Sequence, residues 1–364
     1  FLKFFLMFFS GTLLAQIITM AVSPILTRIY TPEDFGLLAL YLSIVSIMGV
    51  GITARYELAI MLPQKNKDAL NLVVLSIFIS LVISVIVFIL VLVSGKSFAI
   101  ILGNELIYPW LYFVPFSLLL TGVYQSFNYW SNRNKKYRRL ATNRVVQSTT
   151  TAGVNLGIGI MKKGPYGLIL GNIISQTTST LRLSLKSIKE EKISLSNISI
   201  KRIKYLAKRY SQFPKVSVWS ALLNSSSSQM PIFILGAFFS STIVGWYSLA
   251  HRVLKMPMTV LGSAVGQVFF QSSSRIRQEA PSQLKGVTYR AFKNMLFIGL
   301  IPMAIIFGFG DILFSFVFGE SWVNAGQYSR LLSMWLLLVF VSSPLSLLFT
   351  VLEREGIAFL FNVA

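Results

Sequence analysis

Three nitrogen-bearing side chains follow one another in an otherwise apolar stretch: His251, Arg252 and Lys255. If a membrane helix enters from the outside near Ile243, Arg252 lies about 13 Å deep at 1.5 Å per residue. Lys255 follows three residues later on the same helix face. A charged side chain in hydrocarbon costs about 2.5 to 3.5 kcal/mol, so such groups mark a watery cavity or a bound partner. Two cations without a neighbouring carboxylate suit an anionic cargo.

Arg28 and Arg55 are the other arginines on or beside apolar helices. Each fits a cationic cavity, and each also fits a long side chain that reaches from a helix end to the membrane surface, so both interpretations stay open. Glu57 is the one carboxylate that we expect inside a span. It and His251 are candidate proton-linked groups, because histidine titrates near neutral pH. The alternative for His251 is a neutral, hydrogen-bonded neighbour of Arg252.

Amide and hydroxyl side chains recur inside the apolar spans of both halves. Some of them bridge helices, as such residues do in membrane bundles. Their number favours a cavity that holds water and polar cargo. The residues that we expect to line it are Gln16, Asn155, Gln176, Asn224, Ser225, Gln229 and Gln267.

The composition is that of a membrane protein. Hydrophobic residues make up 54% of the 364-residue chain and charged residues only 12%, whereas about a quarter of a soluble domain is charged. The chain has no cysteine and a single histidine, which excludes disulfides, cysteine nucleophiles and thiolate or histidine-rich metal sites. We therefore expect no metal, no cofactor and no catalytic residue.

Ten apolar stretches are long enough to span a bilayer, which takes about twenty residues. This predicts an all-α, multi-pass membrane protein, with an eleventh helix beginning near Gly356. The expected spans are 5–29, 35–62, 70–94, 110–131, 143–161, 165–185, 215–238, 243–273, 292–309 and 331–352.

The net charge of +21 follows the connections between these spans. Lysine and arginine gather after the even-numbered helices, for example in 132–144 and 186–215, and are sparse after the odd-numbered ones. By the positive-inside rule the N-terminus is cytoplasmic. The charge is thus explained by topology and by contact with lipid headgroups, and a nucleic-acid partner is not expected.

The chain divides into an N-terminal lobe at 1–186 with six helices, a basic cytoplasmic linker at 187–214 and a C-terminal lobe at 215–364. Phe35-Gly36 and Val244-Gly245 open helices two and eight in similar contexts, which indicates an internal repeat. The second lobe should then also hold six helices, so we expect its last two to be incomplete here. The longest outside connection is expected at 311–330.

Thr31-Pro32-Glu33-Asp34 places an acidic pair in the first outside loop. It has the pattern of a capping box, with Thr31 as N-cap and Pro32 at the first helical position. The alternative is a catalytic acid, as in a membrane glycosyltransferase.

Several motifs together resemble the Wzx-like polysaccharide transporters, which are lipid-linked oligosaccharide flippases of the multidrug/oligosaccharidyl-lipid/polysaccharide (MOP) superfamily. The resemblance covers essentially the whole chain. The motifs are Leu26-Thr-Arg-Ile-Tyr-Thr-Pro-Glu-Asp-Phe-Gly36, Arg55-Tyr-Glu-Leu-Ala-Ile60, Tyr210-Ser-Gln-Phe-Pro214, Gly245-Trp-Tyr-Ser-Leu-Ala-His-Arg252, Gly266-Gln-Val-Phe269, Phe318-Gly-Glu-Ser-Trp322 and Ser342-Ser-Pro-Leu-Ser346.

This resemblance implies two pseudo-symmetric six-helix lobes around a central cavity and alternating access in a bacterial inner membrane. The cargo would be an undecaprenyl-diphosphate-linked repeat unit of O-antigen, capsule or exopolysaccharide, with polysaccharide assembly proteins as candidate partners. It also implies that Arg28, Arg55 and Arg252, on helices one, two and eight, face the cavity. A straight-helix estimate separates Arg28 from Arg55 unless Pro24 or Gly49 and Gly51 bend the helices.

Two other functions are consistent with parts of the pattern. A drug or cation antiporter of the same superfamily would need a buried acid in helix one or seven, and 5–29 and 215–238 contain none. A polysaccharide polymerase or glycosyltransferase would need a sizeable catalytic outside loop. We therefore expect a transporter and not an enzyme.

Overall fold

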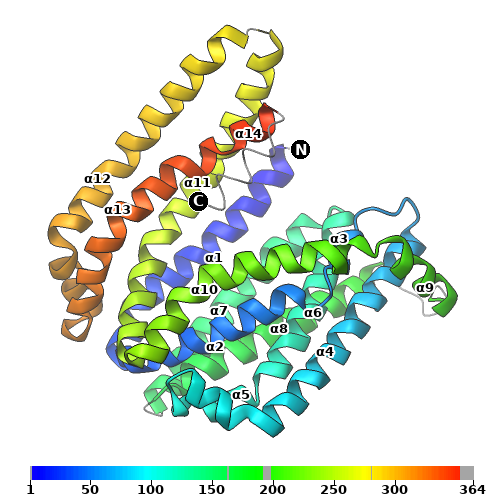
Figure 1. The fold of residues 1–364 in the computed structure, drawn as a ribbon, viewed down its shortest axis with the longest axis horizontal. Helices are drawn as coiled ribbons and strands as arrows, with labels where there is room; N and C mark the ends of the chain where they lie inside the picture. The colour runs from blue at the N-terminus through cyan, green and yellow to red at the C-terminus, as the bar shows by residue number, and fades with distance from the viewer. Residues whose placement is uncertain (1, 162–163, 192–197, 280, 353–364) are drawn as a thin grey trace. The chain divides into compact units, whose positions relative to one another are not determined.

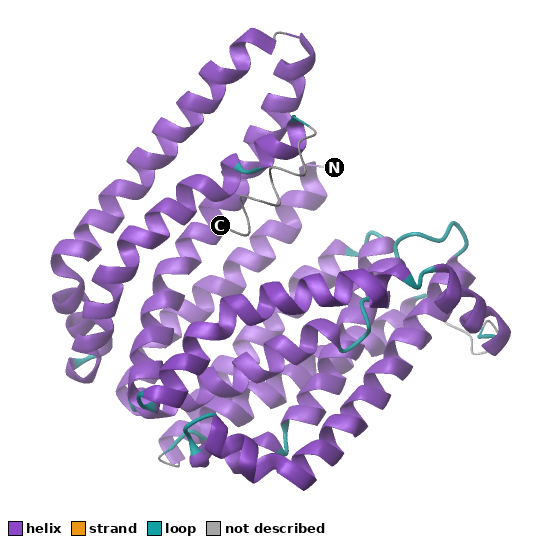
Figure 2. Ribbon diagram, in the orientation of Figure 1, coloured by secondary structure: helices purple, strands orange, loops and turns teal. Residues whose placement is uncertain are grey.

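The structure is a computed structural model that describes residues 2–161, 164–191, 198–279 and 281–352. Two compact units are present, Phe1–Gly245 and Trp246–Ala364, whose helices are traced in Figure 1. Within the described ranges the chain is helical and contains no β-strand (Figure 2). The predicted all-α class is therefore confirmed.

In the first unit, α7 packs against α1 and α8, α4 against α6 and α9, and α2 against α10. A turn of 3-10 helix at Glu105–Ile107 precedes α5, and a turn of π-helix at Phe213–Ser217 precedes α10. The helices are α1 (Leu2–Ile29), α2 (Pro32–Gly51), α3 (Tyr56–Ala59), α4 (Asn66–Ile101), α5 (Tyr108–Leu111), α6 (Val114–Arg133), α7 (Tyr137–Met161), α8 (Tyr166–Glu190), α9 (Ile200–Arg209), α10 (Val218–Phe238) and the start of α11 (Ser241–Glu279).

The second unit contains the remainder of α11, α12 (Leu284–Phe318), α13 (Val323–Leu345) and α14 (Leu347–Val351). Its core joins Leu254 of α11 to Met295 of α12 and Phe340 of α13. Nearer the start of α11, the Trp246 indole Nε1 donates to the Ser321 carbonyl over 2.9 Å. These contacts fix the first part of α11 on the α12–α13 hairpin.

Each of the ten predicted spans coincides with a helix or with two consecutive helices. Among the residues that the structure describes, five helices are long and apolar enough to cross a membrane, or six if α5 and α6, which bend by 51°, form one broken span. The remaining predicted spans, in α7, α8, α10 and α11, are helical but carry the polar and basic residues noted above. The predicted start of an eleventh helix at Gly356 lies outside the described residues.

Two of the predicted long connections are wrong. Between α6 and α7 only Asn134–Lys136 is left, because Tyr137–Thr142 is already helical. On the outside, α12 continues past a kink at Phe309 to Phe318, so the connection to α13 shortens to the turn around Gly319–Trp322. Charged residues in both segments suggested loops, but Arg139 in the first segment and Asp311 with Arg330 in the second form ion pairs within the fold.

The boundary of the first compact unit differs from the predicted lobe boundary, since α10 packs on α2 within the first unit (Figure 1). The Ser43 hydroxyl of α2 donates to the Gln229 amide oxygen of α10 over 2.8 Å. Gly236 lets α10 approach Leu40, because a β-carbon at Gly236 would lie 2.9 Å from Leu40 Cδ2. The division at 186 and 214 stays a prediction about the repeat, while packing groups α10 with the first six predicted spans.

The predicted capping box at the start of α2 is confirmed. The Asp34 carboxylate accepts from the Thr31 backbone N–H over 2.9 Å, and Thr31 Oγ1 accepts from the Asp34 N–H over 3.3 Å. Pro32 occupies the first helical turn, where its missing N–H costs no hydrogen bond. Asp34 is thus engaged in holding the helix end, which argues against a role as catalytic acid.

The first turns of α2 and α11 cross at two glycines. A β-carbon at Gly36 would lie 1.8 Å from the Ser241 carbonyl oxygen, and one at Gly245 would lie 1.8 Å from the Pro32 carbonyl oxygen. Gly36 follows Pro32 by four residues, and Gly245 follows Ser241 by four residues. The two helices therefore contact each other in the same way, and the contact is reciprocal. Such a reciprocal contact is expected where two copies of a repeat meet about a two-fold axis, and these are the two glycines that indicated the repeat.

At the end of the unit predicted to be cytoplasmic, Arg133 organises the segment between α3 and α4. Its guanidinium donates to the carbonyls of Ile60 and Met61, each over 3.1 Å, and to the Pro63 carbonyl over 2.5 Å. A further bond of 3.3 Å reaches the Asn66 side chain. One side chain therefore satisfies a group of carbonyls that no helix accommodates.

We predict that Arg133→Ala lowers the free energy of unfolding by about 2 kcal/mol, because it removes charge-assisted hydrogen bonds. Hydrogen exchange should accelerate chiefly in residues 60–66. The control is Arg138→Ala, since Arg138 is exposed on the first turn of α7 and should leave exchange in 60–66 unchanged. Equal exchange in the two variants would contradict this role of Arg133.

The turn between α6 and α7 is a Schellman motif with lysine in the position that usually holds glycine. The Lys136 N–H donates to the Ser131 carbonyl and the Lys135 N–H to the Asn132 carbonyl, both over 2.9 Å. Lys135 has φ of 56°, in the left-handed region. This conformation costs a residue with a β-carbon about 1 to 2 kcal/mol of conformational free energy, and glycine would avoid that cost.

Candidate functional site

Arg252 and Lys255 lie on α11 with their side chains exposed. In the described part of the chain neither forms an ion pair or a hydrogen bond with a protein group. The one acid of α11 is Glu279, its last residue, which pairs with Arg275 at 3.5 Å. Both cations are therefore uncompensated along the apolar part of the helix, as the sequence predicts.

His251 is half-buried and stacks on Tyr247, one helical turn earlier, with ring centroids 5.8 Å apart and planes at 11°. The stacking holds the His251 imidazole against the Tyr247 ring, one residue before Arg252. This environment matches the neutral-neighbour interpretation more closely than that of a solvated proton carrier. Its proton-linked role stays a prediction.

Arg55 and Glu57 form a pair at a break in the helix. After α2 ends at Gly51, Ala54 and Arg55 adopt left-handed φ angles of 50° and 62°, and α3 begins at Tyr56. Arg55 Nη1 lies 3.5 Å from Glu57 Oε1, and Thr53 Oγ1 donates to Glu57 Oε2. Glu57 is 1% exposed. The single acid expected inside a span is thus neutralised by its own neighbours.

Arg28 is exposed near the end of α1, just before the turn that leads into α2. Arg55 follows the opposite end of α2, which at 20 residues is about 30 Å long. The bend that would bring the two arginines together is absent from α2, whose break comes only after Gly51. The structure therefore does not bring Arg28 and Arg55 into one cluster.

The predicted polar residues of α10 have different surroundings. Asn224 is exposed, and Ser225 is partly exposed and accepts at its carbonyl from the Ser228 hydroxyl over 2.9 Å. Gln229 is held by Ser43 of α2. Asn224 and Ser225 thus remain available to a ligand, while Gln229 also joins two helices.

Three predicted lining residues of the N-terminal lobe are placed between helices. Asn155 is 4% exposed, and in the amide orientation that satisfies its neighbours its nitrogen donates to the carbonyls of Gly167 and Thr151, each over 3.0 Å. Gln176 donates to Thr121 Oγ1 over 2.7 Å and to the Ser117 carbonyl over 3.1 Å. Gln16 is half-buried on α1.

Asn155 and Gln176 thus bridge helices, which is the alternative that the sequence left open. Asn155 is too buried to line a cavity, and the prediction for it is corrected. The side chain of Gln267 lies outside the described residues.

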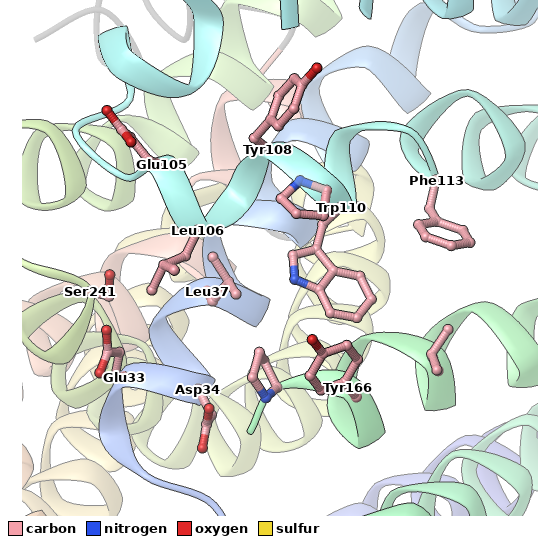
Figure 3. Close-up of a pocket in the computed structure, with 13 residues that line it drawn as sticks. Glu33, Asp34, Leu37, Glu105, Leu106, Tyr108, Trp110, Phe113, Tyr166 and Ser241 are labelled. Atoms are coloured by element: carbon pink, nitrogen blue, oxygen red, sulfur yellow. The ribbon is translucent and has the colours of Figure 1, made fainter. Parts of the chain in front are cut away.

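A cavity of about 560 Å³ opens at the predicted outer end of the first unit, and the sequence did not reveal it. Trp110 and Tyr166 meet edge to face on one side, with ring centroids 5.3 Å apart, and Glu33 and Asp34 lie on the other (Figure 3). The sequence feature that could have indicated this cavity is the group of aromatic residues at the starts of α5 and α8. Aromatic residues are also usual at a membrane interface, so their presence alone does not indicate a site.

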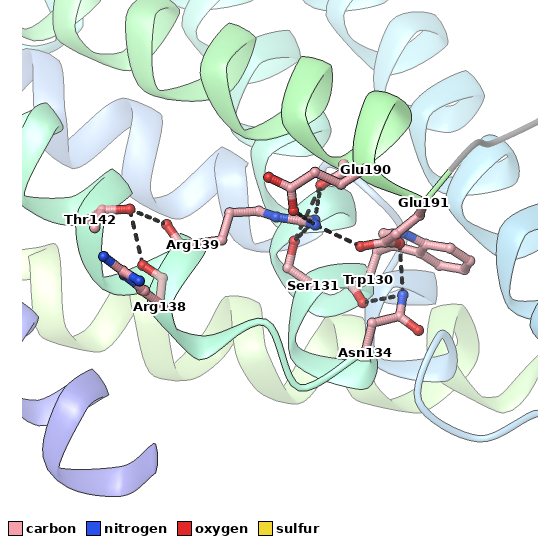
Figure 4. Close-up of polar contacts among 9 residues, drawn as sticks. Trp130, Ser131, Asn134, Arg138, Arg139, Thr142, Glu190 and Glu191 are labelled. Atoms are coloured by element: carbon pink, nitrogen blue, oxygen red, sulfur yellow. Dashed lines mark hydrogen bonds and ion pairs between the residues drawn. The ribbon is translucent and has the colours of Figure 1, made fainter. Parts of the chain in front are cut away.

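A buried ionic network at the predicted cytoplasmic ends of α7 and α8 was also missed. The Arg139 side chain is 5% exposed and lies 2.6 Å from Glu190 and 2.8 Å from Glu191 (Figure 4). It also donates to the hydroxyls of Ser187 and Ser131 over 2.7 and 3.2 Å. Its hydrogen bond holds the pKa of the Glu190 carboxyl below its usual value.

No group of three or more histidine, aspartate or glutamate side chains that could hold a metal ion occurs in the described ranges. The chemistry that this chain offers is instead that of cations, amides and hydroxyls on membrane helices.

Comparison with known proteins identifies a family. The family described as polysaccharide biosynthesis protein matches residues 25–327. The teichuronic acid biosynthesis protein TuaB of Bacillus subtilis (strain 168) is 22% identical over 159 residues, which are 43% of this chain. The matched stretch spans only 32% of that relative.

Solved structures share the fold. A multidrug resistance MATE family transporter of the MOP superfamily, in an inward-facing conformation, matches with a TM-score of 0.68 and 16% identity, over 97% of this chain and 83% of that one. A MOP superfamily transporter from Pyrococcus furiosus, described as having a binding pocket of reverse polarity, matches at 0.62 and 15%, over 98% and 84%. Since the family match covers most of the sequence, the chain belongs to the polysaccharide biosynthesis protein family.

Proposed function

We propose that this chain moves an undecaprenyl-diphosphate-linked oligosaccharide from the cytoplasmic to the outer leaflet of a bacterial inner membrane, by alternating access. The N-terminus faces the cytoplasm in this proposal, as the charge pattern predicts. The product would feed O-antigen, capsule or exopolysaccharide assembly. The observation that carries the proposal is the pair Arg252 and Lys255, exposed on an apolar helix and without an acidic partner in the described residues.

A diphosphate is the group in this cargo that hydrocarbon excludes most strongly. The planar Arg252 guanidinium offers parallel N–H donors that match two phosphate oxygens, and the Lys255 ammonium adds a second charge one turn further. Such a site is costly while empty and stabilised when an anion occupies it. The cation pair would therefore favour cargo that carries phosphate over cargo that carries positive charge.

The sugar part requires weaker and more adaptable contacts. Asn224 and Ser225 on α10 offer amide and hydroxyl groups that donate and accept hydrogen bonds. We assign them to the glycan, and Arg252 with Lys255 to the diphosphate. Arg28 keeps a role only at the outer end of α1, and the Glu57 pairing removes Arg55 from the phosphate site.

The test is transbilayer movement of an undecaprenyl-diphosphate oligosaccharide in proteoliposomes. We predict that Arg252→Ala lowers the transport rate at least about tenfold, which corresponds to about 1.4 kcal/mol of lost phosphate binding. Arg252→Lys should recover only part of the rate, because an ammonium cannot bind two oxygens in parallel. Arg209→Ala, an exposed arginine on α9, is the matched control and should transport normally.

Two outcomes would reject parts of this proposal. If Arg252→Ala folds and transports as well as the native chain, the cation pair is not the phosphate site. If the native chain moves no lipid but exports a cationic dye, it is a drug antiporter, the alternative that the sequence left open. An antiporter is disfavoured because α1 and α10 contain no acid and Glu57 is paired.

A further inference from the structure

Basic side chains surround a second cavity, at the predicted cytoplasmic ends of α7 and α8 in the first unit. Its volume is about 580 Å³, within the usual range of ligand sites. It uses none of the residues that the transport proposal assigns. The charged groups that line it are Lys135, Lys136, Arg138, Arg139, Arg182, Lys186 and Glu190.

The charges of this basic cavity do not balance. Arg139 is buried and committed to Glu190 and Glu191, as Figure 4 shows. Since Glu190 is the one acid among the lining residues, no carboxylate of the cavity is left for the other cations. Five positive side chains therefore face one opening with the acid of that opening already neutralised.

The main-chain geometry adds an independent observation. Lys135 has a left-handed φ of 56°, where glycine would be the more stable residue. A strained residue with a charged side chain beside a cavity points to a role for that charge. The cavity also lies at the N-terminus of α7, where the helix dipole favours an anion.

We propose that this basic cavity binds the phosphate headgroup of a lipid in the cytoplasmic leaflet. Basic pockets between helix ends on the cytoplasmic side suit anionic headgroups. The same chemistry is offered by two sources, a resident anionic phospholipid and the diphosphate of a polyprenyl carrier. In both cases the phosphate contacts Lys135, Lys136 and Lys186, and the hydrocarbon tails stay in the bilayer.

The full chain is purified in a neutral detergent and titrated calorimetrically with short-chain phosphatidylglycerol and, separately, with farnesyl diphosphate. Short-chain phosphatidylcholine is the blank. Lys136→Gln/Lys186→Gln should weaken phosphate binding roughly 30-fold, from about fivefold per lysine. Lys204→Gln/Lys208→Gln removes the same charge from exposed positions on α9 and should change affinity by less than about twofold.

Lys135→Gly separates a binding role from a structural one, because the two predict opposite signs. It should raise the melting temperature by relieving the left-handed strain and yet weaken phosphate binding about fivefold. Tighter binding of phosphatidylglycerol than of farnesyl diphosphate would identify a resident lipid, and the reverse order the carrier. The proposal is overturned if Lys135→Gly binds like the native chain, or if the α9 control loses as much affinity as the cavity variant.

Discussion

Gly36→Ala should lower the free energy of unfolding by about 3 kcal/mol, near the upper end of what overpacking usually costs. The added methyl would stand 1.8 Å from the Ser241 carbonyl oxygen, which is main chain and cannot rotate away. Either α2 and α11 separate, or both distort. Gly245→Ala meets the Pro32 carbonyl at the same distance and should cost a similar amount. Thermal unfolding in detergent, followed by tryptophan fluorescence, measures both.

The matched control is Gly153→Ala on α7. This glycine is exposed, and nothing lies within 4 Å of a β-carbon built there. Alanine is the better helix former by roughly 0.5 to 1 kcal/mol, so this variant should melt at or above the native temperature. If the Gly36→Ala variant melted at the same temperature as the Gly153→Ala variant, the close crossing of α2 and α11 would be refuted.

Replacing both acids of the Arg139 network, as Glu190→Gln/Glu191→Gln, should destabilise the protein by about 3 to 5 kcal/mol. The two carboxylates are the ion-pair partners of a guanidinium that is 5% exposed. Removing them leaves a buried charge uncompensated, which is the costly way to break such a pair. Chemical denaturation of the detergent-solubilised chain provides the measurement.

Arg139→Met is the informative counterpart. Glu190 is 47% and Glu191 14% exposed, so water can solvate these acids better than the arginine. The variant should therefore lose less stability than the double glutamine variant. A larger loss for Arg139→Met would show that its side chain acts by packing and not as a paired charge.

The same network gives the protein a pH dependence with a defined sign. The pKa of Glu190 is lowered below its ordinary 4.5 by the Arg139 hydrogen bond. The unfolded chain then takes up a proton before the folded one, so the stabilisation is complete above about pH 4.5 and is lost as the pH falls. Unfolding of the native chain should become easier below about pH 5, and that of the double glutamine variant should change less over the same range.

The helices of this protein could be predicted largely from the sequence, because apolar length and basic connections are local signals. The capping box of Thr31 and Asp34 could be predicted for the same reason, since it occupies four consecutive residues. The connections were predicted too long where charges pair inside the fold. Arg139 is held by Glu190 and Glu191 of another helix, and no hydropathy window can detect such a partner.

The candidate site was less predictable, because the roles of polar residues depend on packing between helices. Arg252 and Lys255 stood out since the predicted span 243–273 contains no acid. Asn155 and Gln176 looked the same in sequence as Asn224, yet they bond across helix pairs and Asn224 is exposed. The pairing of Arg55 with Glu57 depends on left-handed φ angles at Ala54 and Arg55. Neither residue type favours that conformation, so the sequence does not predict it.

Because α11 runs without interruption from Ser241 to Glu279, one helix carries both the close approach at Gly245 and the cation pair. Arg252 lies about 10 Å along the helix axis from Gly245, at 1.5 Å per residue. The hydrogen bonds of a single helix therefore set the spacing between the glycine crossing and the cations, and this spacing does not depend on packing between helices.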